Sequence, residues 1–359
     1  MIKFYHVCSY VCLLLIFLCL PVFSCSYASL MDYSQPGPHE IDTLDFPDLT
    51  DASRKDRNVP LKIHYPEERG QYPLIIFSHG GMGTRDANIY QAQHLARWGY
   101  VVICMEHVFS NNRRVKYYLS PQGGQMTLKQ AVHKITKDPQ AVLERPKDVR
   151  FAIDQAERWN RQHAVLRGKI NINKIAMMGH SFGAYTTLVA CGARPILDHL
   201  DPVQGTGKGL APPLNDSRII FGFAMSPQSP DTTYFGPDSY RSIDRPLVCL
   251  TGSRDVQKRY DGGVLLPYTR WQVFKLLPDG DKYFFWLKNA DHFAFSDNPE
   301  ARFFPSASRP DAQRISKALM VLFCDYFLKD EKSSIKLIKK TEVRTLEGEV
   351  INQIIWRQK

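Results

Sequence analysis

A five-residue segment between an apolar run and a stretch of small residues constrains this chain more than any other feature. Residues 179–183, Gly-His-Ser-Phe-Gly, match the pattern G-x-S-x-G. Residues 175–178 before it are apolar, as in a buried strand, and residues 184–191 after it are typical of the start of a helix. A turn this tight crowds side chains against the backbone, and glycines at its two ends remove those clashes. The sequence therefore predicts a strand, a sharp turn and a helix that expose Ser181 as a nucleophile beside free helix amides.

Apolar segments typical of buried strands alternate with helical patterns along most of the chain. The predicted strands lie near residues 61–66, 74–77, 100–105, 175–178, 219–225, 246–251 and 283–287, and the first of these reads as an edge or hairpin strand. The predicted helices lie near residues 87–98, 128–135, 146–161 and 312–328, with Pro146 in the first turn of its helix. This alternation predicts an α/β fold in a single domain, residues 59–328, whose mostly parallel sheet is covered by helices on both faces.

Four segments fall outside that alternation. The apolar run Val11–Leu20, about ten residues long, predicts a signal peptide over residues 1–28 and a periplasmic or secreted protein. Cleavage at the small residues after it would give a soluble product, whereas a loose lipobox would leave a lipoprotein anchored through Cys25. The polar residues 29–58 predict a loosely attached N-terminal arm. Residues 108–144 predict a lid-like insertion, and residues 329–359 a basic tail that packs as an added hairpin or stays mobile.

The net charge of +10 limits the classes of partner that the chain favours. Its positive residues are scattered, apart from short groups at 113–116 and 336–340, and the sequence holds no nucleic-acid recognition module, so we expect no nucleic-acid partner. Attraction to anionic lipid or polymer at a membrane surface suits an exported basic protein, with a simply solvated surface as the alternative. The sequence leaves the oligomeric state open.

Four cysteines outside the signal segment lie within apolar strand or helix patterns: Cys104, Cys191, Cys249 and Cys324. They lack the C-x-x-C spacing and the histidine pairs of a zinc site. We expect buried free thiols, with one disulfide as the alternative in an oxidising compartment. The sequence predicts neither a metal nor an organic cofactor.

A serine nucleophile needs a base, and the base needs a group that orients it. Asp255 and His292 each follow a predicted strand, at the ends where sheets of this kind build their sites. The chain order serine, aspartate, histidine is that of α/β hydrolases. His292 is therefore the candidate general base and Asp255 the candidate acid, with Asp261 and Asp279 as alternatives for the acid.

Acyl transfer also needs N–H donors where the oxyanion forms. The backbone amide of Phe182, directly after the nucleophile, is one candidate. The glycine-rich loop after the strand at 74–77 should supply the other, from Gly81 or, failing that, from Met82. Met82, Phe182 and Phe293 are also candidate apolar walls of the substrate site.

The other histidines are expected to have supporting or surface positions. The side chain of His180 should point away from the nucleophile, His79 should hydrogen-bond its own loop, and His107 should support the site from a strand end. The sequence context places three further histidines at the surface: His133, His163 and His199.

Several of these segments together resemble one family. Residues 77–81, 145–149, 179–185 and 224–228 are similar to the α/β-hydrolase family of platelet-activating-factor acetylhydrolases and predicted dienelactone hydrolases, a resemblance that covers roughly residues 50–330. It implies an α/β-hydrolase fold, a triad carried by Ser181, Asp255 and His292, and hydrolysis of carboxylic esters with short or modified acyl chains. Dienelactone hydrolases carry a cysteine at the elbow, where this chain has Ser181, so that substrate does not carry over.

These features predict an exported serine esterase that acts on a small-molecule or lipid ester. Two other classes of function stay open at this point. One is a peptidase or amidase on the same fold, although the large cap or fused propeller that would favour it is not present in the sequence. The other is a catalytically silent, surface-located binding protein.

Overall fold

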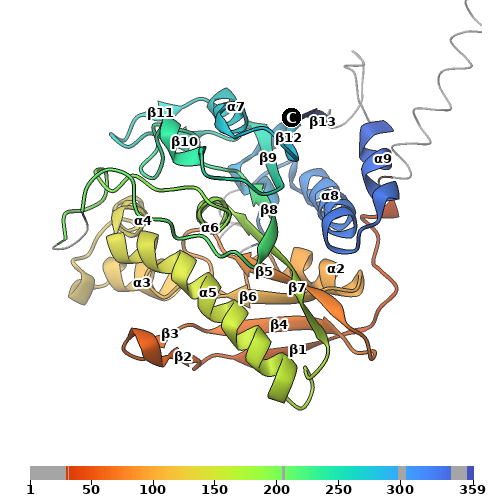
Figure 1. Ribbon diagram of the computed structural model, residues 1–359. Coiled ribbons are helices and arrows are strands. Elements are labelled where there is room, and N and C mark those ends of the chain that lie inside the picture. Colours follow the sequence, from red (N-terminus) through yellow and green to blue (C-terminus); the bar gives the residue numbers. More distant parts are fainter. Residues whose placement is uncertain (1–29, 31, 204–206, 298–304, 341–353) are drawn as a thin grey trace, which may run out of the picture.

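The computed structural model describes residues 30, 32–203, 207–297, 305–340 and 354–359, whose strands form one nine-stranded sheet and two short hairpins (Figure 1). The predicted signal segment, residues 1–28, lies outside the described residues. Across the large sheet the order is β1 (Ile41–Phe46), β4 (Leu61–Pro66), β6 (Val101–Met105), β5 (Tyr72–Ser78), β7 (Ile170–His180), β8 (Ile219–Met225), β9 (Leu247–Arg254), β12 (Lys282–Asp291) and β13 (Ile354–Gln358). The six strands from β6 to β12 are parallel, whereas β4 and β13 pair antiparallel at the two sides of this block.

Helices cover both faces of this sheet (Figure 1). One face packs against α5 (Pro139–Gln162), α6 (Phe182–Ala190) and α7 (Trp271–Leu276), and the other against α2 (Ile89–Arg97), α8 (Arg309–Leu328) and α9 (Lys332–Lys340). Within β5, Leu74 and Ile76 join the first core, and Ile75 and Phe77 join the second. Alternate side chains of a strand point to opposite faces, so a strand buried on both faces is apolar throughout. The predicted α/β-hydrolase fold is confirmed.

Helix α5 begins earlier than the sequence predicts. It starts at Pro139 behind an Asp138 cap, so that Pro146 lies inside the helix rather than in its first turn. A proline at that place leaves the carbonyl four residues back without its helical donor. This carbonyl belongs to Val142, and the buried hydroxyl of Tyr185 in α6 donates to it at 3.1 Å. A contact from a distant part of the chain therefore replaces the lost helical bond.

The predicted insertion folds into two helices, α3 (Asn112–Leu119) and α4 (Leu128–Lys137), and its last residues belong to α5. Helix α3 was not predicted from the sequence, because only Val115 and Tyr118 of this polar helix are buried and its apolar pattern is weak. The buried side chains of α3 and α4 form a small core of their own: Val115, Tyr118, Ala131 and Ile135. Met82 and Met126 pack against this small core. The insertion is thereby attached to the glycine-rich loop after β5.

The N-terminal segment is part of the sheet, so the prediction of a loosely attached arm is wrong. Strand β1 pairs antiparallel with β4 over six residue pairs, so of the two predicted alternatives for β4, an edge or a hairpin strand, the edge position is excluded. The hairpin that follows consists of β2 (Thr50–Asp51) and β3 (Arg57–Asn58), and its Arg57 donates a hydrogen bond to Asp148 of α5. An edge strand exposed on one face needs few apolar residues, which is why this segment reads as polar.

The described part of the basic tail is packed against the domain. Helix α9 follows α8, and its Ile335 joins the core beneath α2 and α8. Strand β13 pairs antiparallel with β12, from Gln358 opposite Tyr283 to Ile354 opposite Leu287. The described tail residues therefore form a helix and one strand of the sheet, which differs from the predicted added hairpin and from a mobile tail, while residues 341–353 lie outside the described residues.

Candidate active site

The turn at Ser181 has the strained geometry that the motif predicts. Ser181 lies between β7 and α6 with φ 57° and ψ −118°. A non-glycine residue held in such a conformation costs about 1–3 kcal/mol. A Cβ added to Gly179 would lie 2.5 Å from the backbone of Gly183, and a Cβ added to Gly183 would lie 1.9 Å from the carbonyl oxygen of Ser78. Only glycine fits at both positions. The Ser181 side chain is half-buried rather than fully exposed.

The structure brings the three predicted triad side chains into one series of hydrogen bonds. His292 begins the short helical turn after β12, and its Nε2 lies 2.8 Å from Oγ of Ser181. Its Nδ1 lies 2.9 Å from Oδ1 of Asp255, at the end of β9. The imidazole is 28% exposed, whereas the carboxylate is fully buried. With the Nδ1 proton donated to Asp255, Nε2 is free to accept the proton of the serine hydroxyl.

Asp255 is held as a carboxylate by its neighbours. Burial raises its pKa, but the Arg270 guanidinium and the contact with His292 outweigh burial, so the net pKa lies below the ordinary value. The hydroxyl of Thr251 donates to its second oxygen at 2.8 Å. The two alternative acids, Asp261 and Asp279, are exposed on the surface. Of the three aspartates weighed for this role, the structure places Asp255 against the imidazole.

Arg270 is a site residue that the sequence analysis missed. Its guanidinium is 2% exposed and donates from Nη2 to Oδ1 of Asp255 at 2.7 Å. Nε donates to the Asp255 carbonyl at 2.9 Å, and Nη1 donates to the carbonyls of Ser226 and Pro227 at 2.8 and 2.7 Å. Arg270 therefore ties the loop of the acid to the loop after β8. An arginine 15 residues beyond the aspartate, in a segment without a motif, gave no local signal.

Two backbone amides beside Ser181 match the requirement for oxyanion donors. The glycine-rich loop approaches the elbow closely, since a Cβ added to Gly80 would lie 3.4 Å from Cβ of Ser181. The amide of Met82 already donates to the carbonyl of Ser110 at 2.9 Å, which removes Met82 as the alternative donor. In the part of the chain that the structure describes, the amides of Gly81 and Phe182 have no acceptor.

The three residues predicted to form apolar walls of the substrate site differ in how close their side chains lie to the triad. The Phe293 ring stands perpendicular to the His292 ring, with centroids 5.5 Å apart. The side chain of Met82 turns to the small core of the insertion. The Phe182 ring is 3% exposed and stacks on Tyr234 at 5.2 Å, so the expectation that this ring lines the substrate site is wrong.

His180 and Gln228 support the site in ways that the sequence did not reveal. Burial lowers the pKa of His180 to about 3, so its neutral ring donates from Nε2 to the carbonyl of His292 at 2.9 Å. Nε2 of Gln228 donates to the carbonyl of Ser181 at 2.7 Å. The side chains thus hold the main chain of the base and of the nucleophile. The only sequence signal for Gln228 was its place in a segment that carries the family resemblance.

The described residues were also compared with the requirements of a metal site, a membrane-spanning helix and a disulfide. Within them, no group of histidine, cysteine and acidic side chains could hold a metal ion. None of the helices among the described residues is long and apolar enough to cross a membrane. The four cysteines outside the signal segment are free and buried, as predicted, and burial raises the pKa of Cys104, Cys191 and Cys249 to about 12.

Comparisons with known proteins agree with the predicted resemblance. Residues 53–151 match the family model described as platelet-activating factor acetylhydrolase, isoform II. A platelet-activating factor acetylhydrolase from Cavia porcellus is 29% identical over 161 aligned positions, which cover 36% of this chain. The match spans 34% of the length of that relative. The resemblance to this family of hydrolases is confirmed, and the region matched by the model includes the glycine-rich loop but ends before Ser181.

Proposed function

We propose that this chain is a serine esterase whose nucleophile is Ser181. The observation that carries the proposal is the unbroken series from Oγ of Ser181 through both nitrogens of His292 to the buried Asp255. The amides of Gly81 and Phe182, which meet no acceptor among the described residues, complete what an acyl-transfer site needs.

The reaction follows from this geometry. Oγ of Ser181 adds to the ester carbonyl carbon while its proton passes to Nε2 of His292, and the carbonyl oxygen becomes an oxyanion at the amides of Gly81 and Phe182. Collapse of this intermediate breaks the bond to the alcohol, which takes the proton from His292. A water molecule then attacks the acyl-enzyme while its proton passes to His292. Collapse of this second intermediate returns the proton from His292 to Oγ of Ser181 and releases the acid. Asp255 stays ionised throughout and stabilises the imidazolium.

The proposed substrate is a carboxylic ester with a short or lipid-like acyl chain. Support comes from the match to a family named for an acetylhydrolase of platelet-activating factor. Because the match covers about a third of each chain, the acyl preference is a proposal for this protein and not an assignment. Neither an amide substrate nor a silent scaffold has a comparable supporting observation.

The proposal is tested by labelling the purified protein with a fluorophosphonate probe, beside Ser181→Ala. Ser120→Ala, at a half-buried serine on the insertion, is the matched control. We expect labelling of the wild type and of the control but not of Ser181→Ala, together with hydrolysis of p-nitrophenyl esters that weakens as the acyl chain lengthens. Labelling without ester turnover would favour an amidase. No labelling would favour the silent scaffold.

We also propose that the enzyme works at an anionic lipid surface. Two groups of exposed apolar side chains support this: Tyr117, Leu119 and Leu128 on the insertion, and Val256, Val264, Leu266 and Tyr268 around the hairpin β10 (Gln257–Lys258) and β11 (Val264–Leu265). Exposed basic residues lie among them: Arg113, Lys116, Lys129, Lys258 and Arg259. Figure 1 shows both groups of elements along the same side of the molecule. We call these twelve residues the apolar–basic rim.

Contacts connect the two parts of the rim. Lys134 of α4 pairs with Asp201 at 2.7 Å, and His199, close to Asp201 in the chain, stacks on Tyr260 of the hairpin at 4.2 Å. His199, predicted to lie at the surface, is half-buried against the Tyr260 ring. Exposed apolar residues interspersed with cations are the composition that binds anionic bilayers.

Co-sedimentation with phosphatidylglycerol vesicles and with phosphatidylcholine vesicles tests the rim. We expect binding to the anionic vesicles, weakened by salt and by Leu266→Asp. Val165→Asp is the matched control, because Val165 is also exposed but lies in the turn between α5 and β7, outside the rim. Equal binding by both variants would contradict a role of the rim.

Export remains a proposal that rests on the apolar run before residue 28. We propose that the mature protein is periplasmic or secreted, as a soluble chain or a lipoprotein acylated at Cys25. Cell fractionation followed by mass determination of the mature N-terminus would separate these outcomes. A full-length cytosolic product would contradict both.

A further inference from the structure

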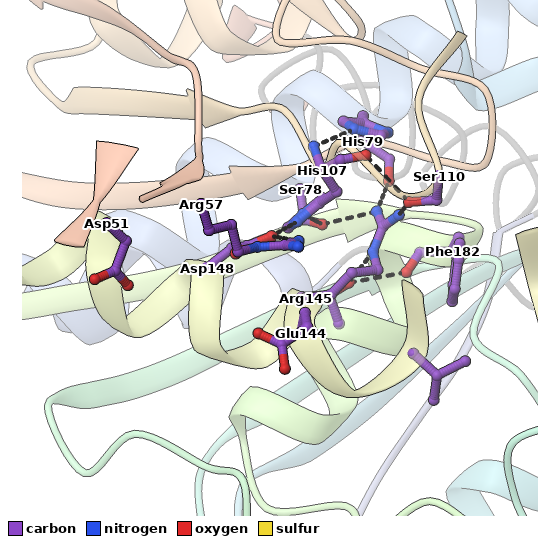
Figure 2. A network of polar contacts seen from close by, with 12 residues as sticks. Asp51, Arg57, Ser78, His79, His107, Ser110, Glu144, Arg145, Asp148 and Phe182 are labelled. Carbon is purple, nitrogen blue, oxygen red and sulfur yellow. Dashed lines mark hydrogen bonds and ion pairs between the residues drawn. The ribbon is translucent and has the colours of Figure 1, made fainter. Parts of the chain in front are cut away.

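A second serine–histidine–aspartate array lies buried beside the candidate active site (Figure 2). Oγ of Ser78, at the end of β5, lies 2.9 Å from Nε2 of His107, and Nδ1 of His107 lies 2.9 Å from Oδ2 of Asp148 in α5. All three residues are at most 1% exposed. An ester cannot reach Ser78 there, so this array is not a second catalytic site.

The charges around this buried array determine the direction of its hydrogen bonds. Arg57 donates to Asp148 from both Nε and Nη2, and Arg54 donates to it as well. Burial raises the pKa of Asp148, but these contacts outweigh it and keep the carboxylate ionised. An ionised carboxylate only accepts, so His107 donates to it from Nδ1. Burial lowers the pKa of His107 to about 3, so its neutral Nε2 accepts the proton of Ser78.

The lone pairs of Ser78 Oγ then face Arg145, near the start of α5. Nη2 of Arg145 lies 3.2 Å from Ser78 Oγ and also donates to the carbonyl of His79. Nη1 donates to Oγ of Ser110 at 2.6 Å, and Nε donates to Oγ1 of Thr186 at 2.9 Å. The guanidinium is fully buried, and burial lowers its pKa to about 9, which leaves it charged at neutral pH.

These contacts connect the two backbone segments that carry the candidate oxyanion donors. His79 lies two residues before Gly81 on the glycine-rich loop, and Thr186 lies on α6, which begins at Phe182. The guanidinium of Arg145 also lies over the Phe182 ring, 4.2 Å from its centroid. Figure 2 shows the side chain between the two segments. The amides of Gly81 and Phe182 must converge on one oxygen, so their relative position matters to the reaction.

We propose that Arg145 is a positioning residue for the oxyanion site. Held in place by the Ser78–His107–Asp148 array, it fixes the loop of Gly81 relative to the helix of Phe182. Arg145 touches neither the substrate nor the reacting atoms. The inference rests on the proposed esterase function and adds how its oxyanion donors are kept in place before the charge develops.

A suitable measurement separates this role from a purely structural one. A trifluoromethyl ketone takes up Oγ of Ser181 at its carbonyl carbon, passes the serine proton to His292 and carries an oxyanion at the two amides. Its inhibition constant therefore reports on the oxyanion site, whereas KM reports on ground-state binding. A structural arginine would affect the free energy of unfolding without changing kcat or the inhibition constant.

Two adjacent threonines of α6 give a matched pair of variants. Thr186 and Thr187 are both buried, and each hydroxyl donates to the carbonyl four residues back, but only Thr186 accepts from Arg145. For Arg145→Lys we expect kcat to fall about 10- to 100-fold, with the inhibition constant of the ketone raised by a similar factor and KM within about twofold. Thr186→Val should show a smaller change of the same kind, and Thr187→Val none.

Several outcomes would overturn the inference. One is unchanged kcat and ketone inhibition in Arg145→Lys, and another is equal behaviour of the two threonine variants. The threonine pair decides the matter if Arg145→Lys does not fold. Failure of the proposed function is seen separately, because the wild type itself would then neither hydrolyse esters nor bind the ketone covalently.

Discussion

Arg270 and Asp255 form a buried ion pair, with Nη2 of the arginine 2.7 Å from Oδ1 of the aspartate and both side chains at most 2% exposed. The same carboxylate oxygen accepts from Nδ1 of His292 at 2.9 Å. The pair therefore supplies both the charge and the position of the group that orients the imidazole. Removing one partner of a buried ion pair is strongly destabilising, because the other charge is left buried without compensation.

Removing Arg270 should leave Asp255 as a buried carboxylate without its cation. We expect Arg270→Met to lower the free energy of unfolding by about 3–5 kcal/mol and to raise the pKa of Asp255. Urea unfolding monitored by tryptophan fluorescence gives the change in stability. Arg241→Met is the control, because Arg241 and its partner Asp238 are both mostly exposed and should contribute at most about 1 kcal/mol. Equal losses in the two variants would contradict the prediction.

Ser181 and His292 should act as a unit in catalysis. We expect Ser181→Ala and His292→Ala each to lower kcat by about 10⁴- to 10⁶-fold, and the double variant to lower it little further. Steady-state kinetics on a p-nitrophenyl ester measure all three. Losses that multiply in the double variant would show that the two side chains do not share one proton-transfer step.

Acid should destabilise the protein because it protonates histidines that the fold buries in the neutral form. Burial lowers the pKa of His107 to about 3 and that of His64 and His94 to about 4. Below about pH 6.5 the unfolded chain therefore binds more protons than the folded one, and stability falls as the pH decreases towards these values, by up to about 1.4 kcal/mol per pH unit for each histidine.

The variant His107→Asn tests this pH dependence. Asparagine keeps a donor for Asp148 but takes up no proton, so the free energy of unfolding should depend less steeply on pH between about 6 and 4.5. The control is His163→Asn, at a half-buried histidine near the end of α5. Urea unfolding at several pH values gives the slopes. An unchanged slope in His107→Asn would refute the assignment of a buried neutral imidazole.

The small core of the insertion should open independently of the main domain. Ile135 is fully buried in it, and a Cβ added to Gly81 would lie 3.8 Å from Cδ1 of Ile135. We expect Ile135→Ala, a change that costs buried sites about 2–5 kcal/mol, to accelerate amide exchange in residues 112–137 with little effect on global unfolding. Hydrogen exchange measured by mass spectrometry resolves the region. Leu128→Ala, at an exposed position of α4, should leave exchange unchanged; uniform acceleration across the domain would count against a separate core.

Local features of the sequence anticipated much of this protein. The glycines at 179 and 183 predicted the elbow, because the steric demands of that turn act within a few residues. Continuous apolar runs predicted the central parallel strands, because a strand that is buried on both faces is apolar at every position. The meeting of Ser181, Asp255 and His292 could be predicted because each follows a strand of the parallel sheet, and the carboxyl ends of such strands lie at one edge.

The tertiary structure decided what depends on partners distant in the chain. Arg145 and Arg270 bind carbonyls and carboxylates from several segments, and Tyr185 satisfies a carbonyl that Pro146 leaves free. The polar edge strand β1 is ordered by its pairing with β4. Backbone conformation and burial depend mainly on residues that are close together in the sequence. The polar groups of the interior find their partners only when the topology brings them together, so the supports of the candidate site could be seen only in the folded chain.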